Sequence, residues 1–154
     1  PRGVLEVGVG TGRVTDALVG AARKNGGVLR YTLVDSWSDW GGVMPQEFAG
    51  RWPMVKVVTS SEAEFVANCR DQFDFIFMDG DHRHTQEWFG DVYGRLLAPH
   101  GMLCYHDVTN TAGFPNLLEL YERCVREGLS YRLFTGSSQP EERCFRGLLV
   151  IFKS

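Results

Sequence analysis

The first apolar run of the chain ends in three closely spaced glycines: Val4-Leu5-Glu6-Val7-Gly8-Val9-Gly10-Thr11-Gly12. Residues 4–7 have the composition of a short strand, and residues 12–24 follow with apolar side chains at helical spacing. The sequence Asn25-Gly26-Gly27 predicts the end of that helix, because glycine readily adopts the left-handed conformation found there. A strand, a glycine turn and a helix in this order predict an α/β fold whose first turn binds a ligand.

The same alternation of strands and helices continues along the chain. We expect helices over residues 45–52, 61–70, 85–97 and 115–127, and strands over residues 29–34, 55–58, 73–78, 102–105, 131–134 and 147–152. Such alternation predicts a mostly parallel sheet with helices on both faces. The last two strands are joined by a short polar segment without a helical pattern, so we expect an antiparallel C-terminal hairpin. The prediction is one Rossmann-like domain over residues 1–154 with a seven-stranded sheet.

The composition is ordinary for a globular domain and gives little support to nucleic acid or a membrane as a partner. Of the 154 residues, 44% are hydrophobic and 23% are charged, and the formal net charge is −3. This charge gives no strong nucleic-acid signal, and no apolar run approaches the roughly 20 residues that span a membrane. The four cysteines lie far apart, which favours reduced thiols. We therefore expect a cytoplasmic protein, and homo-oligomerisation stays open.

The glycine turn and a carboxylate after the second strand predict a nucleoside site. Glycines let the backbone approach a ligand closely, and Asp35 can accept hydrogen bonds from both ribose hydroxyls. Trp37 is the aromatic residue best placed to stack on the ligand. Arg13 stands where the dinucleotide fingerprint G-x-G-x-x-G requires glycine, so the spacing favours a nucleoside that carries an amino acid. The alternatives are a plain tight turn and, for Asp35, a solvated acid.

These motifs resemble the class I S-adenosylmethionine-dependent methyltransferases over essentially the whole chain. Segments 74–82 and 97–107 are similar to small-molecule O-methyltransferases of the macrocin type, and more distantly to catechol O-methyltransferase. Members usually have cover helices before the first strand, and we expect the present domain to lack them. The resemblance implies a cofactor site made by Glu6, Gly8, Gly10 and Gly12 around the methionine part, Asp35 at the ribose, Ser60, Ser61 and Glu62 at the adenine, and Asp79 beside the sulfonium.

Acidic and histidine side chains follow the fourth and fifth predicted strands. If these strands are neighbours, Asp79 and the His106-Asp107 pair emerge side by side, about 4.8 Å apart. We expect them to bind a divalent cation, with Mg²⁺ as the first choice and Mn²⁺ or Zn²⁺ as alternatives. His82 has an unperturbed pKa near 6.5, which suits a general base, so we predict Asp79 and His82 as the catalytic residues. The alternative is that these histidines are solvated or bonded structurally.

The sequence therefore predicts an enzyme that transfers a methyl group from S-adenosylmethionine to a small hydroxylated acceptor with the help of a metal. Two other functions stay open. A catalytically silent cofactor-binding domain is favoured by the expected lack of cover helices. A nicotinamide-dependent oxidoreductase is disfavoured by Arg13.

Overall fold

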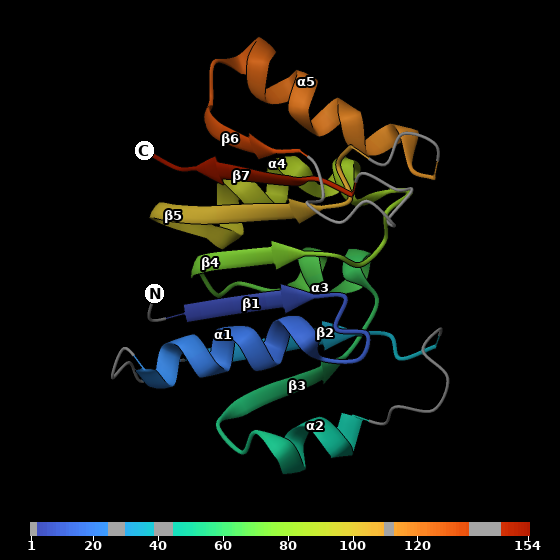
Figure 1. Ribbon diagram of the computed structural model, residues 1–154, viewed down its shortest axis with the longest axis vertical. Helices are drawn as coiled ribbons and strands as arrows, with labels where there is room; N and C mark the ends of the chain where they lie inside the picture. Colours follow the sequence, from blue (N-terminus) through green and yellow to red (C-terminus); the bar gives the residue numbers. More distant parts are fainter. Residues whose placement is uncertain (1–2, 25–29, 39–44, 110–112, 136–145) are drawn as a thin grey trace.

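The computed structural model describes residues 3–24, 30–38, 45–109, 113–135 and 146–154. Within them, one seven-stranded sheet is flanked by helices on both faces (Figure 1). The strands are β1 (Gly3–Val7), β2 (Arg30–Asp35), β3 (Val55–Thr59), β4 (Phe73–Met78), β5 (Leu97–His106), β6 (Ser130–Phe134) and β7 (Leu148–Phe152). The α-helices are α1 (Arg13–Lys24), α2 (Pro45–Arg51), α3 (Glu62–Asn68), α4 (Phe89–Asp91) and α5 (Leu118–Glu127).

The strand order is β3-β2-β1-β4-β5-β7-β6. The first five strands pair in parallel, whereas β7 lies antiparallel between β5 and β6. This arrangement confirms the predicted fold class, including the antiparallel C-terminal hairpin and the contact between β4 and β5. The chain crosses over between β3 and β4, so β1 and β4 lie side by side and their ends form the switch point where ligands bind in open α/β sheets.

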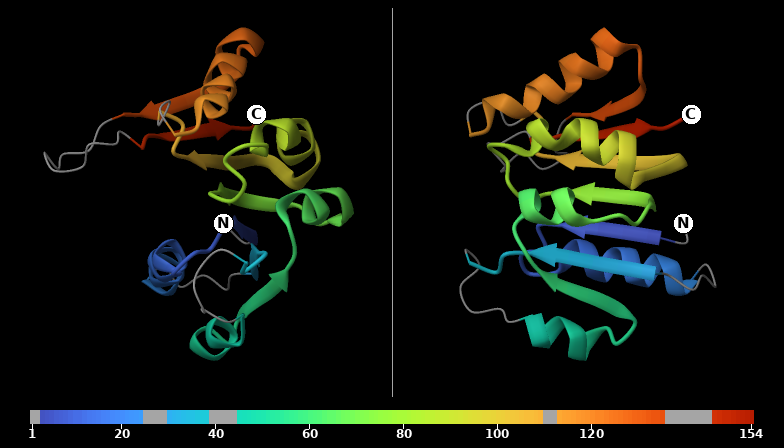
Figure 2. Two further views of the ribbon diagram at one scale, coloured as in Figure 1. Left: turned by 90° about the vertical axis from the view of Figure 1, so that its right-hand side faces the viewer. Right: turned by 180° about the vertical axis from the view of Figure 1, so that it is seen from behind.

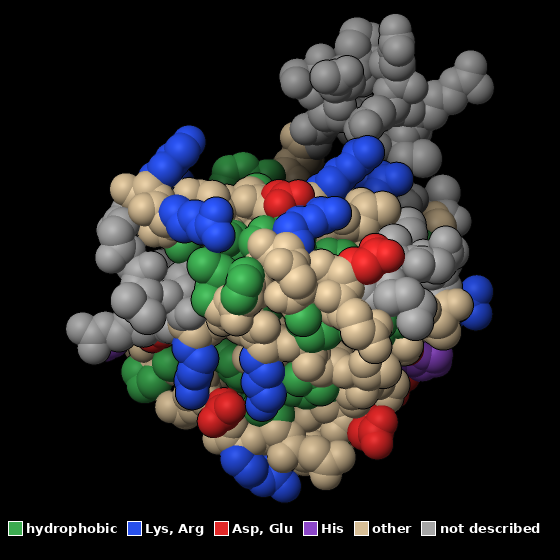
Figure 3. Space-filling model, turned by 90° about the horizontal axis from the view of Figure 1, so that it is seen from below, with side chains coloured by type: hydrophobic (Ala, Val, Ile, Leu, Met, Phe, Trp, Pro, Cys, Tyr) green, Lys and Arg blue, Asp and Glu red, His purple; other side chains and the backbone are tan. Residues whose placement is uncertain are grey.

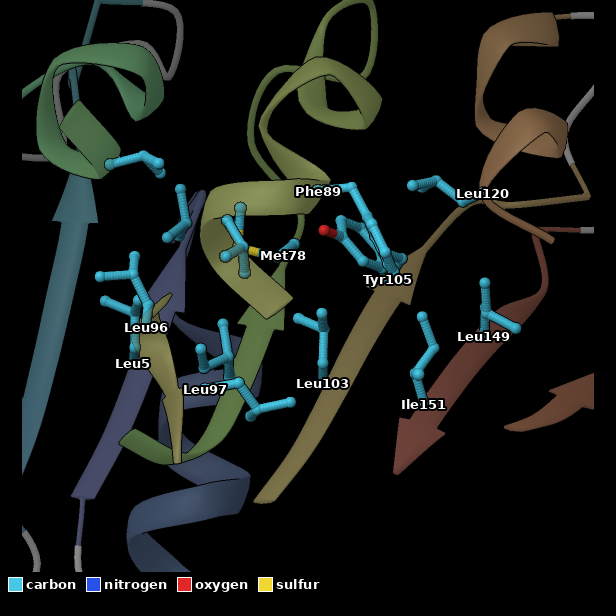
Figure 4. Close-up of a cluster of buried hydrophobic side chains, with 14 of the residues drawn as sticks. Leu5, Met78, Phe89, Leu96, Leu97, Leu103, Tyr105, Leu120, Leu149 and Ile151 are labelled. Carbon is cyan, nitrogen blue, oxygen red and sulfur yellow. The ribbon is translucent and has the colours of Figure 1, made fainter. Parts of the chain in front are cut away.

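Helices cover the two faces of the sheet with separate hydrophobic cores. On one face, α1 and α2 pack over β1, β2 and β3, and on the other lie α3, α4 and α5 (Figure 2). The larger core lies on the second face, where Leu103, Tyr105 and Ile151 from adjacent strands meet Phe89 and Leu120 from the helices (Figure 4). Burial of these apolar side chains holds the strand ends that carry the site in fixed positions.

The predicted helix over residues 85–97 is wrong in its detail. A 3₁₀ turn (Thr85–Trp88), a short α-helical turn and a π-helical turn (Val92–Leu96) replace it. Gly94 lowers the helix propensity there, and Lys153 donates hydrogen bonds at 2.7–3.0 Å to the carbonyls of Tyr93, Gly94 and Leu97. These bonds stabilise the widened turn from outside the helix.

β5 is correspondingly longer than residues 102–105. Leu97 pairs with Phe73 and Met102 pairs with Phe75, so residues 98–101 form a bulge within the strand. His100, in this bulge, has a φ of 61°. The predicted helix over residues 61–70 is shorter, because Ser61 is its N-cap and accepts the N–H of Glu64 at 3.2 Å.

Among the described residues, the face seen from below (Figure 3) shows no large patch of a single side-chain type. There, Lys and Arg side chains stand between hydrophobic and acidic ones (Figure 3). None of the helices in the described ranges is long and apolar enough to span a membrane.

Candidate active site

A pocket of about 630 Å³ opens at the carboxyl ends of β1, β2, β3 and β4. Seven of the residues predicted from the sequence line it, namely Gly8, Asp35, Ser60, Ser61, Glu62, Asp79 and His82. The other predicted residues, Glu6, Gly10, Gly12, His106 and Asp107, lie around it and not among its described lining residues. The pocket is therefore formed where the sequence predicted, with some residues in supporting positions.

The glycines of the first turn serve different purposes. Gly8 has a φ of +80°, and a Cβ there would lie 2.2 Å from the carbonyl oxygen of Asp79, so only glycine allows β1 and β4 to end this close together. Gly12 faces away from the pocket, because its Cβ would collide with the Phe48 ring of α2 at 2.5 Å. Gly12 thus allows α1 and α2 to pack closely.

Asp35 ends β2 and holds the glycine turn. Its Oδ2 accepts the N–H groups of Val9 at 2.7 Å and Gly10 at 3.3 Å, and its Oδ1 accepts that of Trp37 at 2.8 Å. A carboxylate has about four lone-pair sites, so ribose hydroxyls would share Asp35 with these N–H groups. Trp37 packs against Phe48 with ring centroids 5.0 Å apart, which places its indole in the core beside α2.

Glu6 lies beneath the turn and is fully buried. Its carboxylate accepts hydrogen bonds from the hydroxyls of Thr15 in α1 and Tyr31 in β2. Burial raises the pKa of Glu6 to about 7, although both hydroxyls lower it in part. Glu6 therefore ties three elements together under the pocket and supports the turn from below.

The segment after β3 lines the opposite side of the pocket. Ser61 caps α3, and the Ser60 hydroxyl donates a hydrogen bond to Oε2 of Glu64 at 3.4 Å. Glu62 is buried, and its carboxylate accepts the N–H of Asp81 at 2.9 Å and the hydroxyl of Thr85 at 2.5 Å. This side of the pocket is consequently fastened to the loop after β4.

Four side chains meet beyond the ends of β4 and β5. The ring nitrogen Nδ1 of His106 lies 3.0 Å from Oδ1 of Asp79, and Nε2 of His82 lies 3.2 Å from Oδ1 of Asp79 and from Oδ2 of Asp107. One ligand atom from each of Asp79, His82, His106 and Asp107 falls within 4.8 Å of all the others. We call these four residues the Asp–His cluster. The predicted meeting of Asp79 with His106 and Asp107 is thus present, and His82 joins it.

The position of His82 differs from that of a free general base. Its Nδ1 lies 2.8 Å from the carbonyl oxygen of Gly80, and Nε2 points between two carboxylates. Burial lowers the pKa of His82, but Asp107, Asp79 and the Gly80 carbonyl raise it to about 10. Nδ1 is therefore bonded to a backbone carbonyl, and Nε2 faces the carboxylates of Asp79 and Asp107.

Charge in the cluster is balanced between its acids and its histidines. Burial raises the pKa of Asp79, but hydrogen bonds from His106 and His82 outweigh it and bring the pKa below its usual value. The hydrogen bond to Asp79 is the main reason that the pKa of His106 is raised. The ring of His82 also packs on Phe114, with centroids 4.4 Å apart.

The cluster fits a divalent cation. Nε2 of His82 and Oδ1 of Asp107 are buried and have no hydrogen-bond partner within the described part of the chain. Unpartnered buried polar atoms are costly, and a cation bound among them would satisfy both. Two carboxylates with two imidazoles also form a ligand set that Mg²⁺, Mn²⁺ or Zn²⁺ can accept.

Sequence reasoning missed several residues around the pocket. Tyr31, Thr15 and Thr85 each hold a buried carboxylate through a single hydroxyl. Thr15 could have been found, because a polar residue on the buried side of α1 needs a partner. Phe114 and Tyr31 carry no comparable signal, since aromatic residues in apolar surroundings are usual in a core.

Comparison with known proteins agrees with this geometry. A family model described as a methyltransferase domain matches residues 5–108. None of the curated protein sequences matches the chain. An O-methyltransferase from Bacillus cereus, solved in complex with SAH, is 18% identical with a TM-score of 0.76, and the match covers 99% of this chain and 74% of that one.

Two further solved structures share the fold at similar distance. Cofactor-bound Rv0187 from MTB is 18% identical with a TM-score of 0.74, covering 98% of this chain and 72% of that one. Spermidine synthase from Thermotoga maritima is 16% identical with a TM-score of 0.72, covering 100% of this chain and 54% of that one. Because the family model matches well over half of the chain, the protein belongs to the methyltransferase domain family and is a methyltransferase enzyme.

Proposed function

We propose that this methyltransferase uses S-adenosylmethionine to methylate a hydroxyl oxygen of a small acceptor, with a divalent cation held by the Asp–His cluster. One observation carries the proposal: the pocket and the cluster share Asp79 and His82. A donor in the pocket and an acceptor at the cluster would therefore meet at these two side chains.

The pocket has the size and the groups that a nucleoside cofactor requires. Its volume of about 630 Å³ is in the usual range for small-molecule sites. Asp35 supplies a carboxylate at the end of β2, and Gly8 lines the pocket at the end of β1 with its backbone, because it has no side chain. The Bacillus cereus O-methyltransferase binds SAH on the same fold, which supports a sulfonium donor in this pocket.

The proposed reaction transfers a methyl group from the sulfonium of the cofactor to a hydroxyl oxygen of the acceptor. The acceptor hydroxyl would lose its proton to solvent, its oxygen would attack the methyl carbon, and the carbon–sulfur bond would break with its electron pair on sulfur, leaving the thioether. A bound divalent cation would lower the pKa of the acceptor hydroxyl and orient its oxygen. Asp79, His106 and Asp107 would hold the cation, and His82 would complete the ligand set. Phe114 covers the His82 ring and limits the access of water to it.

Binding measurements test the cofactor. We expect calorimetry to show binding of S-adenosylmethionine and of SAH, and no comparable binding of NAD. NAD binding without S-adenosylmethionine binding would refute the proposal and favour an oxidoreductase.

A methyl-transfer screen tests the reaction. Sugars, catechols and other small hydroxylated compounds are offered with labelled S-adenosylmethionine and Mg²⁺, Mn²⁺ or Zn²⁺. Transfer to an oxygen that stops in excess chelator supports the proposal. Transfer to nitrogen or carbon contradicts the proposed hydroxyl acceptor, and full activity with chelator contradicts the proposed metal. Cofactor binding without transfer to any compound favours a silent binding domain.

A further inference from the structure

A buried glutamate joins the cofactor side of the pocket to the loop that carries the Asp–His cluster. Glu62 begins α3, after β3, yet its carboxylate bonds to the segment after β4, where Oε2 accepts the N–H of Asp81 at 2.9 Å and Oε1 accepts the Thr85 hydroxyl at 2.5 Å. Glu62 is 7% exposed and Thr85 is 4% exposed. Hydrogen bonds shielded from water in this way are strong and fix their partners in place.

The loop held by Glu62 is organised around Asp81. The Asp81 carbonyl accepts the N–H groups of Thr85 at 2.8 Å and of His84 at 3.2 Å, and its side chain accepts that of Arg83 at 3.0 Å. The remaining backbone donor, the Asp81 N–H, bonds to Glu62. Glu62 therefore bonds to both ends of the segment 81–85, at Asp81 and at Thr85, and His82 lies between these two residues.

The packing next to His82 leaves little freedom for this contact. A Cβ at Gly80 would come within 2.8 Å of Oε2 of Glu62 and 3.2 Å of Val7. The Gly80 carbonyl is the group that contacts Nδ1 of His82 at 2.8 Å. The Gly80 backbone, whose carbonyl contacts the His82 ring, thus lies close to the Glu62 carboxylate, with no room for a side chain between them.

Capping of α3 does not account for Glu62. Ser61 already supplies the cap by accepting the Glu64 N–H, and an acid in the first turn of a helix acts on the dipole without leaving solvent. Glu64 shows the ordinary arrangement, since it lies exposed in the same turn. Glu62 is instead buried with both oxygens bonded to the distant loop.

We propose that Glu62 is a positioning residue, which sets the place of His82 relative to Asp79 and Asp107. No hydrogen bond or ion pair joins Glu62 to a cluster side chain, and it acts through the backbone of Asp81 and the hydroxyl of Thr85. The effect on cation binding rests on the proposed function, whereas the effect on His82 itself belongs to the protein without ligands.

Three variants test this role. Glu62→Met removes both bonds at similar size, and Glu62→Gln keeps them, because the amide oxygen can accept the Asp81 N–H while the amide nitrogen donates to Thr85. Glu64→Met makes the same change at an exposed position of the same turn. The imidazole nitrogen resonances of His82 are recorded by NMR in the ligand-free proteins, and Mn²⁺ affinity is measured separately.

We expect Glu62→Met to shift the His82 resonances and to weaken Mn²⁺ binding by about tenfold or more, as is typical when partners outside the ligand set are lost. Glu62→Gln should restore both values to near those of the parent, and Glu64→Met should leave them unchanged. A folded Glu62→Met protein with parental His82 resonances overturns the proposal. A shift that Gln does not rescue also overturns it, since the hydrogen bonds would then not be the cause.

Two further outcomes remain decisive. If Glu62→Met does not fold, Thr85→Val is used instead, because it removes one of the two hydrogen bonds. A shifted His82 resonance in Thr85→Val then supports the proposal, and an unchanged resonance overturns it. If the parent binds no Mn²⁺ and no SAH, the proposed function fails, but the His82 resonances still test the role of Glu62.

Discussion

Nε2 of His82 lies 3.2 Å from Oδ2 of Asp107, across the gap between the loops that follow β4 and β5. Asp107 reaches this position with a φ of 60°, a left-handed conformation that aspartate tolerates better than most residues. The contact puts His82 inside the Asp–His cluster. The sequence predicted a general base at this position, and the contact with Asp107 adds the role of a metal ligand that we propose for His82.

Replacing His82 by Ala separates these two roles. Loss of one of four ligand groups should weaken Mn²⁺ binding by at least the roughly 10–100-fold that loss of a partner outside the ligand set costs, measured by titration followed with electron paramagnetic resonance. His84→Ala is the control, because His84 is exposed and pairs with Asp81 outside the cluster. If His82 acts as a base alone, His82→Ala binds Mn²⁺ as the parent does and loses about 10²–10⁴-fold in rate.

Asp35→Ala should destabilise the protein as well as weaken cofactor binding. The substitution leaves the N–H of Val9, a residue only 5% exposed, without its acceptor, and a buried unsatisfied donor costs about 1–3 kcal/mol. Urea unfolding without ligand measures this part, and calorimetry with SAH measures the rest. Asp35→Ala with parental stability would show that the turn does not depend on Asp35.

The stability of the protein should fall between about pH 4.5 and pH 7 because of Glu6. Its pKa rises on folding from 4.5 to about 7, mainly through burial. The folded state therefore holds this proton more tightly than the unfolded state. The stabilisation is complete below pH 4.5 and is lost as the pH rises through 7.

Glu6→Gln should make this decrease smaller than in the parent by about 3 kcal/mol, at about 1.36 kcal/mol for each pH unit of pKa shift. Burial also raises the pKa of Glu62 to about 7, and its contribution is the same in both proteins. The free energy of unfolding is measured in urea at pH 4.5 and pH 8 for the parent and the variant. Glu122→Gln, at an exposed position of α5, is the control. An equal decrease in parent and Glu6→Gln would mean that Glu6 stays charged in the folded protein.

Two glycine-to-alanine changes should act in opposite directions. Gly8→Ala places a Cβ against the Asp79 carbonyl and requires a left-handed residue, so we expect a loss of about 2 kcal/mol or more. Gly20→Ala, in α1 with open space around it, should raise the stability by about 1 kcal/mol. Thermal unfolding compares the two. A neutral Gly8→Ala would mean that β1 and β4 end farther apart.

Most of the fold was predictable because most of its strands and helices are encoded locally. The apolar run over Phe73–Met78 and the glycines after β1 define a buried parallel sheet by composition alone. The helix expected after Thr85 was wrong because its last turn depends on Lys153, a residue distant in sequence that bonds to three carbonyls. Local periodicity carries no information about such a partner.

The position of the candidate site was predictable in part. Asp79 and Asp107 were found because parallel neighbours end at one edge of the sheet. The role of His82 could not be read from spacing, because a shift of a few ångströms in its loop separates a free ring from one held between two acids. The partners of Glu6 and Glu62 depend on single hydroxyls, which the sequence does not distinguish from other serines, threonines and tyrosines.

The place of β7 between β5 and β6 has a consequence for synthesis on the ribosome. When β6 has been translated, β7, its one neighbour in the sheet of the described residues, does not yet exist, so β6 has no strand to pair with. Contacts between segments distant in sequence form slowly, and domains assemble as the chain emerges. We expect nascent chains that stop before β7 to be sensitive to protease within α5 and β6, while β1 to β5 are already protected.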